Sequence, residues 1–286
     1  MVAERTNSVA SVDGTTIAIR SIGRGEGVIV VGGALRTGED YLPFARSLAE
    51  GFAAHVVDRR GRGLSGPLGP DYSIDRECDD LLAVQAATGA TRVFGHSYGA
   101  LVALQTAARS DAFAQVAVYE PGVSVGGSIP AGWLNEYERM LGDGDPRGAF
   151  AVFVRGSGHA PAALAGMPTW YSRLILRAAV RGRRWQQVDP LLAANLAEHR
   201  EVARLDGVVG YARITAPVLL LAGSRSPHRQ TEALRELHAA LPHAAYEIMD
   251  GLDHLAPDEK APEAVAARVA SAFGADAPPR RPQPAA

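Results

Sequence analysis

The chain has 286 residues, 47% of them hydrophobic, which is enough for one large domain or a domain that carries an insertion. Its 29 basic and 31 acidic residues give a formal net charge of −2, without a Lys/Arg run long enough to predict nucleic-acid binding. The single cysteine, Cys78, excludes an intramolecular disulfide and provides no metal-ligand spacing, so no metal site is expected.

Short apolar runs alternate along the chain with helical patterns, which is the layout of an α/β protein with a mostly parallel sheet. Most of these runs are too continuously apolar for a sheet with one exposed face, so we expect helices on both faces. The predicted strands are residues 16–20, 28–31, 53–57, 92–94, 115–119, 218–222 and 245–248. The predicted helices are residues 39–50, 74–88, 98–109, 230–241 and 261–273.

One long segment, residues 121–213, breaks this alternation because it has no clear strand pattern. A stretch of this length is rarely structureless inside a compact domain. We therefore predict a helical cap over residues 121–213, inserted into a core made of residues 1–120 and 214–275. The tail, residues 276–286, has little apolar content and is predicted to be disordered.

The pentapeptide Gly95-His96-Ser97-Tyr98-Gly99 lies directly between a predicted strand and a predicted helix. In this context a G-x-S-x-G sequence forms a tight turn that exposes the serine hydroxyl at the carboxyl end of a sheet. The helix that follows directs its first amide groups toward the same place. We therefore predict that Ser97 is a nucleophile and that His96 supports the turn; the alternative is an ordinary glycine-lined turn.

Together with three further segments, this turn resembles the α/β-hydrolase superfamily. The segments are residues 58–65 (Asp-Arg-Arg-Gly-Arg-Gly-Leu-Ser), residues 217–223 (Pro-Val-Leu-Leu-Leu-Ala-Gly) and residues 251–254 (Gly-Leu-Asp-His). The resemblance runs through nearly all of residues 16–273 outside the predicted cap. It implies an α/β-hydrolase fold, a mostly parallel, doubly covered sheet with an inserted helical cap. It also implies that His254 is the base that a serine nucleophile needs.

The acidic member of the expected triad departs from the superfamily pattern. Most members have an aspartate after the strand that here is residues 218–222, but this chain has Ser226 there, and a serine does not stabilise an imidazolium as a carboxylate does. Glu120 is the best replacement, because it ends the neighbouring predicted strand and the carboxyl ends of parallel strands converge. In this the chain is similar to zearalenone-type lactone hydrolases, which use Ser, His and Glu. The competing carboxylates are Asp250 and Asp253.

The resemblance also implies an oxyanion hole made of two backbone amides. One is the amide of Tyr98, and the other maps to Ala34, in a loop where this chain has Gly32 in place of the histidine that is common in the superfamily. The substitution keeps the donor, because the donor is a main-chain group. The candidate substrate-binding residues are Leu35, Arg36, Trp133, Trp170 and Trp185.

These features favour a serine hydrolase that cleaves a carboxylic ester or lactone of a small, fairly apolar molecule through an acyl-enzyme, without a cofactor. Two alternatives stay open: a non-hydrolytic enzyme of the same fold, such as a lyase, cyclase or perhydrolase, and a ligand-binding protein with a degenerate triad.

We expect a cytoplasmic protein without a membrane partner, because residues 1–14 lack the layout of a signal peptide and no apolar run has membrane-spanning length. The heavy use of Ala, Arg, Gly and Pro is typical of a GC-rich bacterial genome. No nucleic-acid partner is expected, and assembly into a homodimer stays open.

Overall fold

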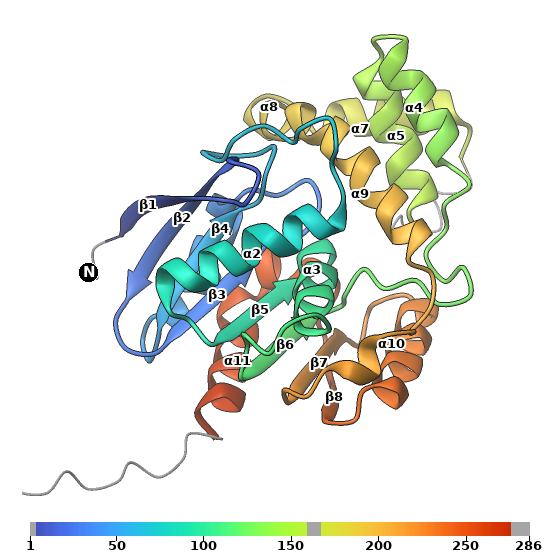
Figure 1. The fold of residues 1–286 in the computed structure, drawn as a ribbon. Helices are drawn as coiled ribbons and strands as arrows, with labels where there is room; N and C mark the ends of the chain where they lie inside the picture. Colours follow the sequence, from blue (N-terminus) through green and yellow to red (C-terminus); the bar gives the residue numbers. More distant parts are fainter. Residues whose placement is uncertain (1–3, 159–166, 276–286) are drawn as a thin grey trace, which may run out of the picture.

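The computed structural model describes residues 4–158 and 167–275 (Figure 1). Within these residues the strands form one sheet in the order β1-β2-β4-β3-β5-β6-β7-β8. Their bounds are β1 (Arg5–Ala10), β2 (Thr16–Gly23), β3 (Gly27–Val31), β4 (Ala53–Asp58), β5 (Arg92–His96), β6 (Gln115–Tyr119), β7 (Val218–Gly223) and β8 (Ala244–Met249). The tail predicted over residues 276–286 lies outside the described residues.

The sheet is antiparallel only at one edge. β2 pairs antiparallel with β1 and β4, whereas every pair from β4 with β3 through β7 with β8 is parallel. All residues of β5 and β6 are buried, as expected for central strands with helices on both sides. The predicted α/β class with a mostly parallel, doubly covered sheet is therefore confirmed. In such a sheet, the carboxyl ends of the parallel strands meet at one edge, where ligands bind.

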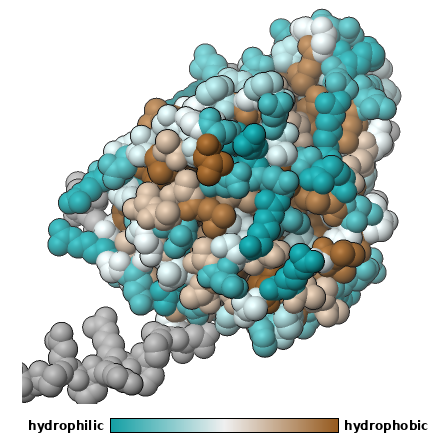
Figure 2. All heavy atoms as spheres, viewed as in Figure 1, coloured by the Kyte–Doolittle hydropathy of each residue, from teal (hydrophilic) through white to brown (hydrophobic). Residues whose placement is uncertain are grey.

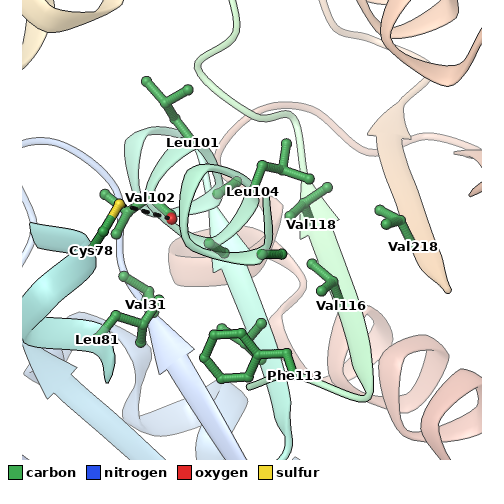
Figure 3. Packing of buried hydrophobic residues seen from close by; sticks show 14 of the residues in the cluster. Val31, Cys78, Leu81, Leu101, Val102, Leu104, Phe113, Val116, Val118 and Val218 are labelled. Carbon is green, nitrogen blue, oxygen red and sulfur yellow. Dashed lines mark hydrogen bonds between the residues drawn. The ribbon is translucent and has the colours of Figure 1, made fainter. Parts of the chain in front are cut away.

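Two layers of helices cover the sheet (Figure 1). α2 (Ile74–Thr88), α3 (Tyr98–Ala107) and α10 (His228–Ala240) contribute to a core on one face. Figure 3 shows part of this core, with Leu104 of α3 beside Val116 and Val118 of β6. α1 (Leu42–Leu48) and α11 (Pro262–Ala275) pack together in a second core on the other face.

Two elements differ from the sequence prediction. The strand β1 has no apolar pattern to predict it, because its residues are mostly polar and exposed at the edge of the sheet. The single helix predicted over residues 39–50 is instead a 3-10 turn, η1 (Gly38–Tyr41), followed by α1. Pro43 in the first turn of α1 explains the break, because proline has no amide hydrogen with which to continue a preceding helical turn.

Between β6 and β7 the chain forms a group of helices, here called the inserted helices. They are α4 (Leu134–Gly142), α5 (Pro146–Gly156), α7 (Thr169–Ala179), α8 (Arg183–Val188) and α9 (Leu192–Arg204). Trp133, Tyr137, Phe150 and Leu192 are buried in a third apolar core that these helices share. Figure 1 shows the group at one end of the sheet, with α9 nearest to it.

On the face that Figure 2 shows, apolar residues lie in small groups among hydrophilic ones. Trp170 and Leu174 of α7 are among the large apolar side chains that are exposed. Within residues 4–158 and 167–275, no helix is both long enough and apolar enough to cross a membrane.

Candidate active site

Ser97 lies at the tight turn between β5 and α3. Its φ of 53° and ψ of −120° are unusual for a residue with a side chain, and such strain persists only where the surrounding structure imposes it. The turn is also closely packed, since a Cβ on Gly99 would lie 2.3 Å from the carbonyl oxygen of Val31. The first turn of α3 thus rests directly on the end of β3, which raises the Ser97 hydroxyl at the carboxyl edge of the sheet.

Two hydrogen bonds join the side chains of Ser97, His254 and Glu120 in a row. The Oγ atom of Ser97 is 3.1 Å from Nε2 of His254, and Nδ1 of His254 is 2.8 Å from Oε2 of Glu120. His254 follows β8, and Glu120 follows β6 directly, with a positive φ of 43° and an exposed fraction of 3%. The structure therefore brings together the three side chains that the sequence analysis selected, in the geometry of a nucleophile, a base and an orienting acid.

Ser226, at the usual position of the acid, has a clear role in the structure. Its hydroxyl donates a hydrogen bond to Oε1 of Glu120, and the amide of Gly223 donates a second one to the same oxygen at 2.8 Å. Oε2 is then directed at His254. Burial alone would raise the pKa of Glu120, but the hydrogen bonds from His254, Gly223 and Ser226 outweigh it and hold this pKa below its usual value.

The competing carboxylates point elsewhere. Asp253 accepts hydrogen bonds from the backbone amide of Leu255 and from the ammonium of Lys260. Asp250 accepts one from the hydroxyl of Ser224. Glu120 is accordingly the carboxylate placed to orient His254.

A buried chain of hydrogen bonds runs through His96 from the backbone of His254 to the loop that contains Gly33. Nε2 of His96 lies 2.9 Å from the carbonyl oxygen of His254, so it carries the proton, and Nδ1 accepts from the hydroxyl of Tyr41 at 2.6 Å. Tyr41 in turn accepts from the amide of Gly33 at 2.8 Å. Burial, with the nearby charge of His254, lowers the pKa of His96 well below its usual value, so the ring stays neutral as this chain requires.

Tyr41 also accounts for glycine in place of the superfamily's histidine. A Cβ on Gly32 would lie 2.4 Å from the ring of Tyr41, so this ring excludes any side chain at that position. The loop continues into Ala34, which lines a cavity together with Ser97, Tyr98 and His254. Ala34 and Tyr98 therefore line the same cavity as the Ser97 side chain, which is where the predicted oxyanion hole requires them.

Two cavities meet at Ser97 and share Ala34, His199 and His254. The smaller one has a volume of about 40 Å³ and is mostly apolar. Its apolar walls include Ile129, Val202, Leu234 and Leu237. The larger one, of about 340 Å³, lies under the inserted helices. Its apolar walls include Leu35, Phe150, Phe153, Val154 and Val188.

The candidate substrate-binding residues are only partly placed as predicted. Leu35 and Arg36 line the larger cavity, but the guanidinium of Arg36 is held by Asp258 and Glu259 in the helical turn η4 (Ala256–Lys260).

The three tryptophans predicted to bind substrate do not line either cavity, which is a correction to the sequence analysis. Trp133 is buried in the core of the inserted helices, Trp170 is 69% exposed on α7, and the ring of Trp185 packs under the guanidinium of Arg147. Scattered aromatic residues reveal neither which face of a helix they occupy nor what covers it.

The sequence analysis missed the contribution of α5 and α9 to the cavities. Phe150, Phe153 and Val154 come from α5, and their three- and four-residue spacing is the helical periodicity that marks one face. His199 of α9 lines both cavities, and its Nδ1 donates to the carbonyl oxygen of Asn195 at 2.9 Å. Burial lowers the pKa of His199, which keeps the ring neutral and leaves Nε2 as a hydrogen-bond acceptor.

Comparison with known proteins places the chain among hydrolases. The model of a family described as the alpha/beta hydrolase family matches residues 28–268. Two curated relatives are named putative carbamate hydrolase RutD. The one from Escherichia coli O7:K1 is 30% identical, over 78% of this chain and 82% of its own length. The one from Cronobacter turicensis is 26% identical, over 79% of this chain and 83% of its own length.

Solved structures agree with the sequence matches. An alpha/beta hydrolase from Sphaerobacter thermophilus DSM 20745 superposes with a TM-score of 0.80 at 30% identity. The match covers 93% of this chain and all of that protein. A hydrolase from Pseudomonas aeruginosa PA01 superposes with a TM-score of 0.70 at 21% identity, over 94% of this chain and 98% of its own, which supports the fold alone.

The turn at Ser97 gives a prediction about stability. Replacing Gly99 with Ala is expected to lower the free energy of unfolding by about 1–3 kcal/mol, because the added Cβ must separate α3 from β3. Urea unfolding measures this loss. The matched control is Gly142→Ala, at an exposed position in α4 where a Cβ meets nothing within 4 Å. Equal stability of the two variants would contradict the prediction.

The position of Glu120 gives a second prediction. In Glu120→Gln the neutral amide cannot stabilise an imidazolium, so phosphonylation of Ser97 by a fluorophosphonate is expected to slow by about 10³–10⁴-fold. The rate is followed by intact mass. The matched control, Asp253→Asn, removes the competing carboxylate and is expected to change this rate by less than about threefold, because Asp253 bonds Lys260 rather than the His254 ring. The reverse order of effects would make Asp253 the acid.

Proposed function

Because this chain belongs to the alpha/beta hydrolase family, we propose that it is a serine hydrolase that cleaves a carboxylic ester or lactone of a small, fairly apolar molecule. The observation that carries the proposal is the continuous hydrogen-bond sequence from Ser97 through His254 to Glu120. A ligand-binding protein with a degenerate triad has no need of this arrangement. The carboxylate at the second ring nitrogen of His254 therefore counts against that alternative.

In the proposed reaction, His254 accepts the proton of Ser97 as Oγ attacks the substrate carbonyl carbon. The resulting oxyanion lies against the amides of Ala34 and Tyr98. His254 then gives its proton to the leaving alkoxide, and an acyl-enzyme remains on Ser97. Water, deprotonated by His254, attacks this ester, and collapse of the second tetrahedral intermediate releases the acid and restores Ser97. Glu120 stays ionised throughout and stabilises the imidazolium.

The two cavities suggest the shape of the substrate. One side of the scissile carbonyl has space for a small group only, because the smaller cavity holds about 40 Å³. The other side has a cavity of about 340 Å³ with mostly apolar walls, which suits a larger apolar group. In the lactone hydrolases that the chain resembles, the acid also follows the strand that here precedes Glu120. This shared position favours a lactone among such substrates.

A second candidate function is hydrolysis of a carbamate or amide. The observation that favours it is His199, whose neutral ring lines both cavities and is fixed by the carbonyl of Asn195 with Nε2 left as an acceptor. A carbamate or amide N–H is a donor that suits this atom, whereas a simple ester has none. Two relatives carry the name putative carbamate hydrolase, in agreement with this candidate.

The proposed function is tested with an active-site probe. A fluorophosphonate is expected to add once to the wild-type protein and not at all to Ser97→Ala, as intact mass shows. Turnover is then measured on p-nitrophenyl esters and on lactones of increasing ring size. Absence of labelling in folded wild-type protein would refute the proposal and favour a binding or non-hydrolytic role.

Replacement of His199 by Phe separates the two candidate functions. Phenylalanine keeps the ring contacts with Trp133 and Phe153 but removes the acceptor. For a carbamate substrate, kcat/KM is expected to fall about tenfold or more, since an N–H left without its acceptor loses about 1–3 kcal/mol. For the ester with the same leaving group, the change is expected to stay within about threefold. Equal losses for both substrates would contradict a role of His199 in recognising an N–H group.

A further inference from the structure

A buried cluster of charges lies directly behind the oxyanion-hole loop. Two of its members, Arg59 and Arg62, come from the loop after β4, and their side chains are 3% and 1% exposed. Glu77 of α2 binds Arg59 through Nη1 at 2.7 Å. Glu198 of α9, fully buried, binds Arg59 through Nη2 at 2.7 Å and also binds Nη2 of Arg62. One carboxylate oxygen from the inserted helices therefore holds both guanidinium groups.

Both guanidinium groups also reach the backbone of the oxyanion-hole loop. Nη2 of Arg59 donates to the carbonyl oxygen of Gly33 at 3.2 Å, and Nη1 of Arg62 donates to the same oxygen at 3.3 Å. Arg62 further donates to the carbonyl oxygen of Arg36 at 3.3 Å. Two cations thus converge on a single peptide group.

The carbonyl of Gly33 belongs to the same peptide group as the amide of Ala34. In a planar trans peptide the C=O and the N–H point in opposite directions, and no cis peptide occurs among the described residues. When the two arginines hold the Gly33 carbonyl on one side, the Ala34 amide is turned to the other side, toward the cavity that contains Ser97. The charge cluster therefore determines where this oxyanion donor points.

The second oxyanion donor rests on the same cluster. The guanidinium of Arg59 lies 4.8 Å from the ring centre of Tyr98, and the hydroxyl of Tyr98 is 2.8 Å from that of Tyr72. Tyr72 also donates to Glu77 at 2.7 Å. The side chain of Tyr98 is thereby fixed at the first turn of α3, directly after Ser97.

Glu198 is the member on which the arrangement depends most. Arg59 has a second carboxylate in Glu77, but within residues 4–158 and 167–275 the ion pairs of Arg62 include no carboxylate other than Glu198. Without it, a fully desolvated guanidinium keeps only backbone carbonyls as partners, which is an unfavourable state for a buried charge. Arg62 would then move toward water and release the carbonyl of Gly33.

We propose that Glu198 is a positioning residue of the active site, which acts through Arg59 and Arg62 to hold the Gly33–Ala34 peptide in the orientation that binds the oxyanion. This inference rests on the proposed acyl-transfer function. It assigns to helix α9 a part in the rate of the reaction, in addition to its part in shaping the cavities.

The test is Glu198→Gln, with Asp80→Asn as the matched control. Asp80 is also a buried carboxylate paired with an arginine of the same loop, since it accepts from Nε and Nη2 of Arg60 at 2.7 Å. The hydrogen bonds of Arg60 go to Asp80 and Asp13, away from Gly33. The control therefore breaks a comparable buried pair without disturbing the oxyanion donors. Both variants are assayed well below their melting temperatures, with circular dichroism to verify folding.

In Glu198→Gln we expect kcat to fall by about 10–100-fold, less than the 10²–10³-fold typical of removing an oxyanion donor, while KM changes by less than about threefold. Inhibition by an aryl trifluoromethyl ketone, which forms an anionic adduct with Ser97, is expected to weaken by the same factor as kcat/KM. Asp80→Asn is expected to change none of these values by more than about threefold. A purely structural role would lower the melting temperature and leave the inhibitor constant unchanged.

The outcomes distinguish this inference from the proposed function. If a fluorophosphonate fails to label wild-type Ser97, the proposed function is wrong and the inference fails with it. If wild-type is labelled and turns over an ester, but Glu198→Gln matches Asp80→Asn in kcat and in inhibitor binding, only the inference is wrong. Should Glu198→Gln not fold, Arg62→Lys takes its place, with the same expected loss of inhibitor binding, because a single ammonium cannot donate to Glu198 and Gly33 in the geometry of the guanidinium.

Discussion

The packing of α3 against the end of β3 is the constraint on which the site depends. Gly99 lies so close to the carbonyls of Val31 and Gly32 that no side chain fits between them. Ser97, two residues earlier in the same turn, has a positive φ, and a Cβ on Gly33 of the loop after β3 would lie 3.1 Å from the Cβ of Ser97. One close backbone approach therefore holds the turn that carries Ser97 beside the loop that carries Ala34, so in the proposed reaction the strain at Ser97 accompanies preorganisation of the site.

The proposed acid, Glu120, follows a different strand from the usual one and still contacts the ring of His254. Glu120 follows β6, which lies between β5 and β7 in the sheet, so its carboxylate reaches His254 from the strand next to the nucleophile. The residue at the usual position of the acid, Ser226, donates a hydrogen bond to Oε1 of Glu120, and the amide of Gly223 donates another to the same oxygen. The neighbouring strand end thus supplies the donors that keep the relocated carboxylate ionised and oriented.

The features that the sequence predicts are those with a local pattern. Apolar runs predicted β5 and β6, and a helical pattern predicted α2. The turn at Ser97, the position of His254 in the family resemblance and the strand end at Glu120 selected three side chains that the structure brings together. Features that depend on distant partners were not predictable. Arg59 and Glu198 are 139 residues apart, and nothing around either residue indicates that both charges are buried. The prediction that the three tryptophans bind substrate was wrong for the same reason, since their burial depends on how the inserted helices pack.

Helix α9 carries both a wall of the two cavities and the carboxylate that binds Arg59 and Arg62. His199 and Glu198 are consecutive, and because consecutive helical residues point about 100° apart, one faces the cavities while the other faces the arginines. A change that tilts or shifts α9 to admit a new substrate must therefore also move the carboxylate that holds Arg59 and Arg62. The walls supplied by α5 are coupled to the same helix, because Phe150 shares an apolar core with Leu192 and Leu196 of α9 and the ring of Phe153 contacts the ring of His199. A substitution at Phe153 that enlarges the larger cavity therefore also removes packing from the helix that carries Glu198.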